Sequence, residues 1–127
     1  MQDAKARRIL IVDDEPDVRF VLKTALQRNG YTTEEAASGV EALEALKGSI
    51  PDAILLDVMM PKLDGFSLNQ RLKADPRLAG VPVIIMTGKG HMKELFEARK
   101  DLTVAAYLEK PFAVAVLIER LVSLWRY

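Results

Sequence analysis

Five short runs of apolar and β-branched residues alternate along the chain with longer stretches in which apolar residues recur at helical spacing. Helices that connect parallel strands cover both faces of the sheet, so this alternation predicts an α/β fold with a parallel sheet. The predicted strands are residues 8–12, about 31–37, 52–56, 81–86 and about 104–108. The first predicted helix begins near residue 16. Four more are predicted at about residues 40–47, 66–74, 92–100 and 114–125.

The apolar positions within these elements predict how each one is buried. The first strand is apolar throughout, which favours burial on both faces, whereas the second is more polar and is expected at an edge of the sheet. The first helix has a predicted core stripe of Val18, Val21, Leu22, Ala25 and Leu26. The last helix has core spacing at Val114, Leu117, Ile118, Leu121 and Trp125. Its apolar face is wider than one-sided packing needs, so we expect part of it to meet a partner.

Composition narrows the class of protein. A chain of 127 residues suits one core, and we expect residues 1–127 to form a single domain. Cysteine is absent, which excludes disulfides and thiolate chemistry. Eighteen basic residues balance eighteen acidic ones, so no net positive field favours direct binding to nucleic acid. No apolar run approaches the roughly 20 residues of a membrane span, and we see no secretion signal, so we expect a cytoplasmic protein.

Chemically reactive side chains follow four of the five predicted strands. These residues are Asp13 and Asp14 after the first strand, Asp57 after the third, Thr87 after the fourth and Lys110 after the fifth. In open α/β sheets, functional groups gather at the carboxyl ends of the strands. If the first and third strands are neighbours, three carboxylates meet there, and ionising all of them is costly without a cation.

A divalent metal ion would relieve this repulsion. Mg²⁺ prefers oxygen ligands and is usually held by one or two carboxylates together with a phosphate. Three carboxylates also balance the combined charge of one Mg²⁺ and Lys110. Asp57 is the predicted nucleophile, because a carboxylate can form an acyl phosphate. Asp13 and Asp14 are the predicted metal ligands, and Thr87 can donate a hydrogen bond to the phosphoryl group.

These residues lie in segments that resemble the receiver domain of bacterial two-component response regulators over nearly the whole chain. The matching segments are Ile11–Glu15, Leu55–Gly65, Ile85–Gly88 and Tyr107–Phe112. The resemblance implies a stand-alone receiver, similar to those of chemotaxis, with no output domain. It also implies a flavodoxin-like fold, in which a doubly wound five-stranded parallel sheet of order 2-1-3-4-5 is flanked by five helices.

The resemblance further implies a specific chemistry. A histidine kinase or a histidine phosphotransfer protein donates a phosphoryl group to Asp57, with the help of Lys110 and Thr87. The cofactor is Mg²⁺, which Mn²⁺ can replace. The implied metal ligands are Asp14, Asp57, the main-chain carbonyl of Met59 and, partly through water, Asp13. Such a domain catalyses only its own phosphorylation and dephosphorylation, so it is a signalling domain rather than an enzyme.

In this family phosphorylation changes a surface that binds other proteins. The resemblance implies that Thr87 turns toward the phosphoryl group, that Tyr107 changes rotamer, and that the face of the fourth helix, fifth strand and fifth helix then controls a downstream protein. A homodimer through the same face and a cis Lys110–Pro111 peptide are also implied. We further hypothesise that Met59 and Lys89 set the lifetime of the acyl phosphate, because Met59 stands two positions after Asp57 and can limit attack by water.

Three other classes of protein compete with this interpretation. A receiver-like interaction module that is never phosphorylated would not need the intact set of Asp14, Asp57, Thr87 and Lys110. A Mg²⁺-dependent aspartate phosphatase would usually resemble Asp-x-Asp after the first strand, where this chain has Asp13-Asp14. A flavin-binding module needs a hydroxyl- and glycine-rich phosphate loop at the same place, where three consecutive acids would repel phosphate.

Overall fold

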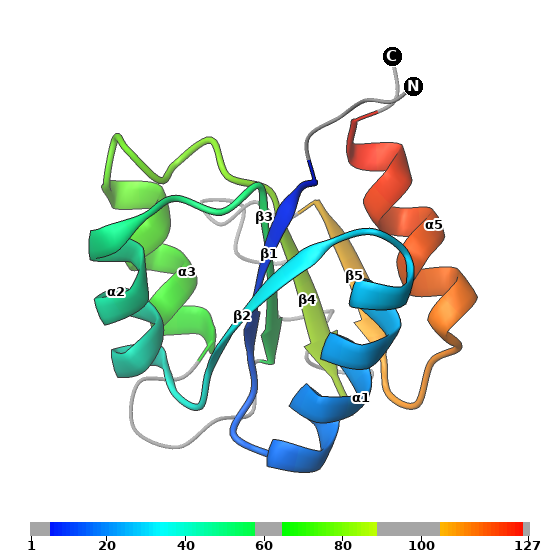
Figure 1. Cartoon of the computed structure of the whole chain (residues 1–127). Helices are drawn as coiled ribbons and strands as arrows, with labels where there is room; N and C mark the ends of the chain where they lie inside the picture. Colours follow the sequence, from blue (N-terminus) through cyan, green and yellow to red (C-terminus); the bar gives the residue numbers. More distant parts are fainter. Residues whose placement is uncertain (1–5, 58–64, 89–104, 126–127) are drawn as a thin grey trace.

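The structure, a computed structural model, describes residues 6–57, 65–88 and 105–125. Within these residues, the strands form one five-stranded sheet in the order β2-β1-β3-β4-β5 (Figure 1). The strands are β1 (Arg8–Val12), β2 (Thr32–Ala36), β3 (Ala53–Asp57), β4 (Val83–Thr87) and β5 (Ala106–Glu109). Every neighbouring pair is parallel. The predicted strand order and the edge position of the second strand are therefore confirmed.

The described helices have clear start and stop signals. They are α1 (Pro16–Arg28), α2 (Gly39–Gly48), α3 (Gly65–Ala74) and α5 (Val114–Leu124). Pro16 occupies the first turn of α1, where its missing N–H breaks no helical hydrogen bond. Asn29 caps the other end of α1, and Gly30 follows at a φ of 90°, a conformation that glycine adopts without strain. Ser38 caps α2 by accepting a hydrogen bond from the Glu41 N–H at 3.1 Å.

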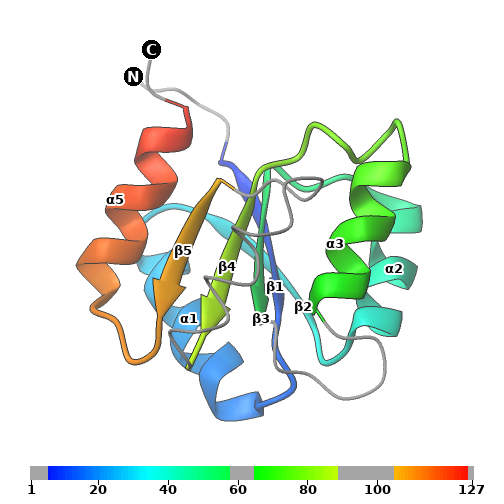
Figure 2. The same cartoon turned by 180° about the vertical axis from the view of Figure 1, so that it is seen from behind.

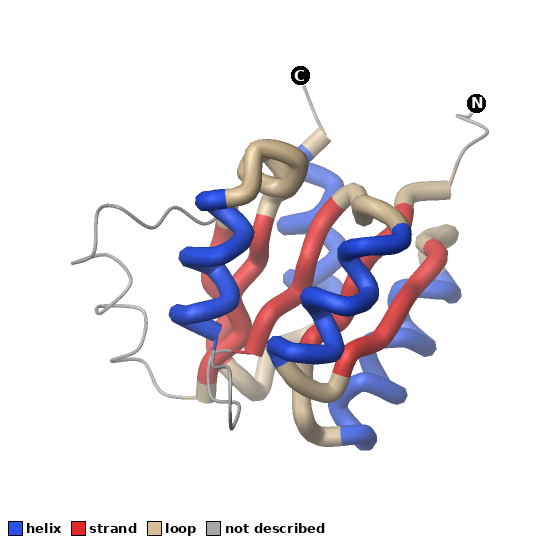
Figure 3. The backbone as a smooth tube through the Cα atoms, turned by 90° about the vertical axis from the view of Figure 1, so that its left-hand side faces the viewer, coloured by secondary structure: helices blue, strands red, loops and turns tan. Residues whose placement is uncertain are grey.

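The helices cover the sheet on both faces. Figures 1 and 2 show α1 and α5 on one face and α2 and α3 on the other. The side view in Figure 3 shows the strands between the two helical layers. Because successive strand residues point to opposite faces, Ile9 and Ile11 join the core under α1 and α5, whereas Leu10 and Val12 join the core under α2 and α3. The predicted doubly wound arrangement is confirmed.

Several predicted strand bounds differ from the structure by one or two residues, and two of these differences have a clear cause. The N–H of Val81 donates to the Leu78 carbonyl in the preceding turn, and Pro82 has no N–H for a ladder, so β4 begins at Val83 instead of residue 81. The third strand extends one residue further than predicted, because Asp57 still pairs with β4. The backbone of Asp57 is therefore held by the sheet.

Two residues of the predicted core stripes lie at the surface instead. The stripes of α1 and α5 bury their leucines as predicted, but Val21 is 56% exposed and Val114 is 39% exposed. Both valines lie where α1 and α5 stand beside each other on the sheet, and the two helices do not close over them. The apolar stripe of each helix is therefore wider than the surface that the sheet covers.

One predicted helix cannot be compared with the structure. Residues 92–100 lie outside the described residues. In the parts of the chain that are described, no helix has the length and apolar character needed to cross a membrane.

Candidate functional site

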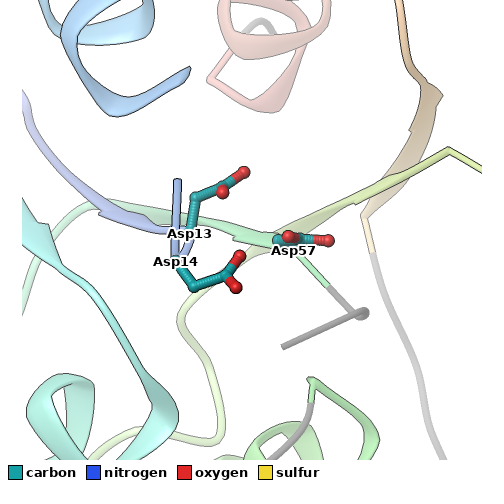
Figure 4. A group of neighbouring side chains, drawn as sticks. All are labelled: Asp13, Asp14 and Asp57. Atoms are coloured by element: carbon teal, nitrogen blue, oxygen red, sulfur yellow. The ribbon is translucent and has the colours of Figure 1, made fainter. Parts of the chain in front are cut away.

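The carboxylates of Asp13, Asp14 and Asp57 meet at the carboxyl end of the sheet (Figure 4). Because β1 and β3 are neighbours, the turn after β1 and the last residue of β3 lie side by side. One carboxylate oxygen of each residue lies within 4.8 Å of those of the other two. Asp13 and Asp57 are buried, whereas Asp14 is exposed. The structure therefore brings the three predicted acidic residues together.

Asp13 is bonded through each of its polar atoms. Its N–H donates to the Ala36 carbonyl of β2 at 3.1 Å, which extends the contact between β1 and β2 by one residue. Its Oδ1 accepts a hydrogen bond from the Glu15 N–H at 2.9 Å, and its Oδ2 accepts one from Lys110 Nζ at 2.8 Å. Its carbonyl accepts a hydrogen bond from Arg19 Nη1 at 2.7 Å. These four contacts fix Asp13 and suit it to organising the site.

Lys110 brings a positive charge to the acidic cluster. Its Nζ lies 2.8 Å from Asp13 Oδ2, 3.6 Å from Asp57 Oδ2 and 3.9 Å from Glu15 Oε1. Burial lowers the pKa of Lys110, but the hydrogen bond to Asp13 and the charges of the three carboxylates outweigh that effect, so the pKa lies above its ordinary value of 10.5. The ammonium group therefore keeps its charge at neutral pH and above.

The charges of this site fit a divalent metal ion. Three clustered carboxylates face one ammonium group, which leaves an excess of negative charge around two buried residues. Like charges so close together repel each other. Mg²⁺ takes oxygen ligands and is usually held by one or two carboxylates, with its other positions open to water or phosphate. The oxygen atoms that the three aspartates offer match this preference.

The other predicted site residues are placed as follows. Thr87 ends β4 and is buried, and its carbonyl accepts a hydrogen bond from the Lys110 N–H at 2.7 Å. This bond joins the ends of β4 and β5 beside the acidic cluster, and the Lys110–Pro111 peptide is cis as predicted. Tyr107 of β5 is half-buried against the core under α2 and α3. Two predicted residues, Met59 and Lys89, lie outside the described residues.

Arg19 is a residue of this region that the sequence analysis missed. Besides its bond to the Asp13 carbonyl, its Nε donates to Glu35 Oε1 of β2 at 3.0 Å. The side chain of Arg19 is only 17% exposed. Asp13 lies in the turn after β1, Arg19 lies on α1 and Glu35 lies on β2, and no local motif relates the three. The only signal in the sequence was that Arg19 follows the Asp13–Asp14 segment by about one turn of helix, which places it near the acidic cluster.

An apolar groove of about 390 Å³ opens beside Lys110, and it was also missed. It lies between α1 and the segment that enters α5, and its apolar lining consists of Val18, Val21, Leu22, Pro111, Phe112 and Val114. A second hollow of about 240 Å³ shares Val21 and Val114 with the groove and reaches Phe20, which is 67% exposed. An apolar surface therefore extends from the site along α1.

Comparison with known sequences adds an independent observation. The sequence matches the family described as "Response regulator receiver domain" over residues 9–122. The response regulator MprA of Mycobacterium ulcerans (strain Agy99) is 42% identical over 119 residues, which cover 94% of this chain and 50% of MprA. The chain spans about half the length of the curated relatives it matches.

Solved structures give the same picture. A sensor protein from Polaromonas sp. JS666 has a TM-score of 0.87 at 29% identity, over 94% of this chain and 95% of that chain. The response regulator protein TrrA of Thermotoga maritima, solved in complex with Mg(2+)-BeF, has a TM-score of 0.82 at 30% identity, over 93% of this chain and 98% of that chain. The sequence match, the fold and the acidic cluster at the end of the sheet agree: this chain belongs to the response regulator receiver domain family of two-component systems.

Proposed function

We propose that this receiver accepts a phosphoryl group on Asp57 from a protein phosphohistidine, in a reaction that needs Mg²⁺. The observation that carries the proposal is the surroundings of Asp57. This carboxylate is 4% exposed at the end of β3, it shares a cluster with Asp13 and Asp14, and Lys110 Nζ lies 3.6 Å from it. Asp57 is thus a buried carboxylate beside two further acids and a cation. Such surroundings suit a residue that accepts a phosphoryl group.

In the proposed reaction a carboxylate oxygen of Asp57 attacks the phosphorus atom of the donor. The new P–O bond forms as the P–N bond breaks, and the histidine nitrogen leaves with the electron pair of that bond and takes up a proton. Mg²⁺, when bound, neutralises charge on the phosphoryl oxygens. Asp14, Asp57 and the carbonyl of Met59 would hold it, with Asp13 acting partly through water. Mn²⁺ can take the same oxygen ligands.

Lys110 and Thr87 complete the proposed reaction centre. Lys110 keeps its ammonium charged, because the pKa of this group is raised by its acidic neighbours. Its ammonium group would move from Asp13 toward the phosphoryl oxygens, because the phosphoryl group carries more negative charge than a carboxylate. The hydroxyl of Thr87 would donate a hydrogen bond to the same group. TrrA, a relative solved with Mg(2+)-BeF, supports a bound metal and a phosphoryl mimic in this family.

The donor in this proposal is a protein, either a histidine kinase or a histidine phosphotransfer protein. The apolar groove beside Lys110 supports this partner, because a donor that delivers a phosphoryl group to Asp57 must approach over the adjoining surface. Phe20 and Val21 of α1 are exposed there, and buried apolar residues at the centre of an interface supply much of its binding energy. A small phosphodonor needs none of this surface.

The proposed output is control of a downstream protein. Thr87 and Tyr107 would act as the switch. The partner would bind the face formed by the fourth helix predicted from the sequence, β5 and α5, and a homodimer could assemble through the same face. The proposal concerns the receiver domain of residues 1–127 alone, in the cytoplasm, with a protein target rather than direct contact with nucleic acid. In it the domain catalyses only its own phosphorylation and dephosphorylation.

The experiment that tests the proposal uses the mass of the intact protein. The chain is incubated with acetyl phosphate and Mg²⁺, and we expect a gain of one phosphoryl group. The gain should disappear in the Asp57→Asn variant and when EDTA removes the metal. Asp52→Asn is the matched control, because Asp52 lies at the opposite end of β3 and should not affect phosphorylation.

The same experiment separates the competing classes of protein. A receiver-like module that only binds a partner would keep its original mass under every condition. A phosphatase would release phosphate continuously without accumulating a stable modified form. Either result would overturn the proposal.

A further inference from the structure

Arg19 joins the acidic turn to the edge of the sheet. Its Nη1 donates to the Asp13 carbonyl at 2.7 Å, and its Nε donates to Glu35 Oε1 on β2 at 3.0 Å. The guanidinium is a rigid planar fork, so two bonds to different elements fix their relative position more firmly than a flexible amine could. At 17% exposure this side chain is also largely shielded from water.

The atom that Arg19 binds lies in the peptide between the two acidic residues of the turn. The carbonyl of Asp13 belongs to the same peptide plane as the N–H of Asp14, so fixing this carbonyl fixes the orientation of the plane. That plane also contains the Cα of Asp14, so fixing it fixes where the side chain of Asp14 starts and leaves φ of Asp14 as the backbone rotation that directs its Cβ. Asp14 is exposed and lies outside the described strands, whereas the backbone of Asp57 pairs with β4. Arg19 therefore acts where the cluster has least support.

We infer that Arg19 is a positioning residue for the metal site, and that Glu35 serves it as an anchor. By holding the Asp13–Asp14 peptide against β2, Arg19 keeps the carboxylate of Asp14 within reach of Asp57 before the metal binds. It also occupies the Asp13 carbonyl, so that this oxygen is not offered to the metal. The inference rests on the proposed function, because it assigns Arg19 a role in binding Mg²⁺ at that site.

The test compares Mg²⁺ binding among variants of the full chain. Arg19→Gln removes the fork and its charge, Arg19→Lys keeps only the charge, and Glu35→Gln weakens the anchor. Lys23→Gln is the matched control, because Lys23 lies one helical turn further along α1 and also pairs with Glu35, at 3.8 Å. For each variant, the Mg²⁺ dissociation constant is measured by calorimetry, and thermal unfolding is measured in EDTA.

We expect Arg19→Gln to weaken Mg²⁺ binding about tenfold, as is typical when a group that orients a metal ligand is lost. The Mg²⁺ dissociation constants of Arg19→Lys and Glu35→Gln should lie between those of Arg19→Gln and the wild type. The constant of Lys23→Gln should stay within about twofold of the wild-type value, because an exposed ion pair contributes little. In phosphorylation by acetyl phosphate, the Mg²⁺ concentration at half-maximal rate should rise with the dissociation constant. The rate at saturating Mg²⁺ should stay close to that of the wild type, since Arg19 does not touch the reacting atoms.

Two results would overturn the inference. One is equal Mg²⁺ affinity in the Arg19→Gln and Lys23→Gln variants. The other is a lower phosphorylation rate for Arg19→Gln that saturating Mg²⁺ does not restore, which would indicate general damage to the fold. Should Arg19→Gln fail to fold, the ranking of Arg19→Lys and Glu35→Gln against Lys23→Gln decides the question in the same way. If the wild type itself neither binds Mg²⁺ nor becomes phosphorylated, it is the proposed function that fails.

Discussion

At the scale of single residues, Asn69 of α3 differs from the rest of the core. It is fully buried, and in the part of the chain that the structure describes neither its amide nitrogen nor its amide oxygen has a hydrogen-bond partner. A buried polar group without a partner costs about 1–3 kcal/mol, because it loses its bonds to water and gains none. Asn69 therefore lowers the stability of the helix that follows Asp57 in the chain.

Replacing this amide should stabilise the protein. We expect Asn69→Leu, which removes both polar atoms and keeps a branched side chain, to raise the free energy of unfolding by about 1–2 kcal/mol. Urea unfolding measures the change. Gln70→Leu is the matched control on the exposed neighbouring position and should change stability by no more than about 0.5 kcal/mol. A loss of stability in Asn69→Leu would mean that the amide has a partner in the folded protein.

The lifetime of the acyl phosphate is also a property of single residues. Our proposal is that Met59, two positions after Asp57, shields the phosphoryl group from water and that Lys89 affects the same step. Met59→Asn should then speed dephosphorylation, because a polar side chain can hold a water molecule near the phosphorus, and Lys89→Glu should change the rate through its reversed charge. The decay of the phosphorylated mass after removal of acetyl phosphate measures both. Unchanged decay in both variants would contradict the hypothesis.

At the scale of elements, α1 and α5 lie on the same face of the sheet and leave an apolar groove between them that ends at Lys110. The same periodicity that buries the leucines of these helices also carries Val21 and Val114 to the open side of the pair. One end of the groove is thus lined by Lys110 of the proposed reaction centre, and its length runs along α1. In the proposed function, this arrangement would place a donor protein that binds the groove beside Asp57.

A charge in this groove should separate protein donors from small ones. We expect Val21→Glu to slow phosphoryl transfer from a phosphorylated histidine phosphotransfer protein by at least about tenfold, the effect of losing roughly 1.4 kcal/mol of binding. Its phosphorylation by acetyl phosphate should not change. Val40→Glu is the matched control, because Val40 is 54% exposed and lies on α2, on the other face of the sheet. Equal slowing by both variants, or loss with both donors, would contradict docking in the groove.

At the scale of the whole molecule, the acidic site stores electrostatic repulsion in the folded state. In the unfolded chain Asp57 is far from Asp13 and Asp14, whereas folding brings their oxygens within 4.8 Å of one another. A cation that binds only the folded protein therefore both relieves repulsion and adds binding free energy. In the proposed function, binding of the metal and the stability of the fold are coupled in this way.

This coupling predicts that adding metal and removing one of the acidic charges both stabilise the folded protein, and that the two gains do not add. Mg²⁺ at a hundred times its dissociation constant should stabilise the wild type by about 2.7 kcal/mol. Asp14→Asn should be more stable than the wild type in EDTA, because one repelling charge is gone, and should gain little from Mg²⁺. Urea unfolding with and without the metal measures both effects. Glu119→Gln, which removes one exposed charge from α5, is the control and should gain as much from Mg²⁺ as the wild type does.

Much of this molecule could be predicted from local features of the sequence. Apolar periodicity is a local property, so it indicated the strands, the described helices and the polar edge strand without knowledge of the fold. The site residues at the strand ends were predictable for a related reason. A parallel sheet places the carboxyl ends of all its strands at one edge, so Asp13, Asp57 and Lys110 meet there once the strands are recognised.

Only the tertiary structure decided how those groups are paired and which apolar residues stay exposed. Lys110 pairs more closely with Asp13 than with Asp57, Arg19 reaches across from α1 to the acidic turn, and Val21 stays open beside α5. The Lys110 contacts join residues that are distant in sequence, the Arg19 contact depends on how α1 leaves the acidic turn, and the exposure of Val21 depends on how two helices lie on the sheet. Local patterns carry no information about such distances, because they are determined by packing of the whole chain.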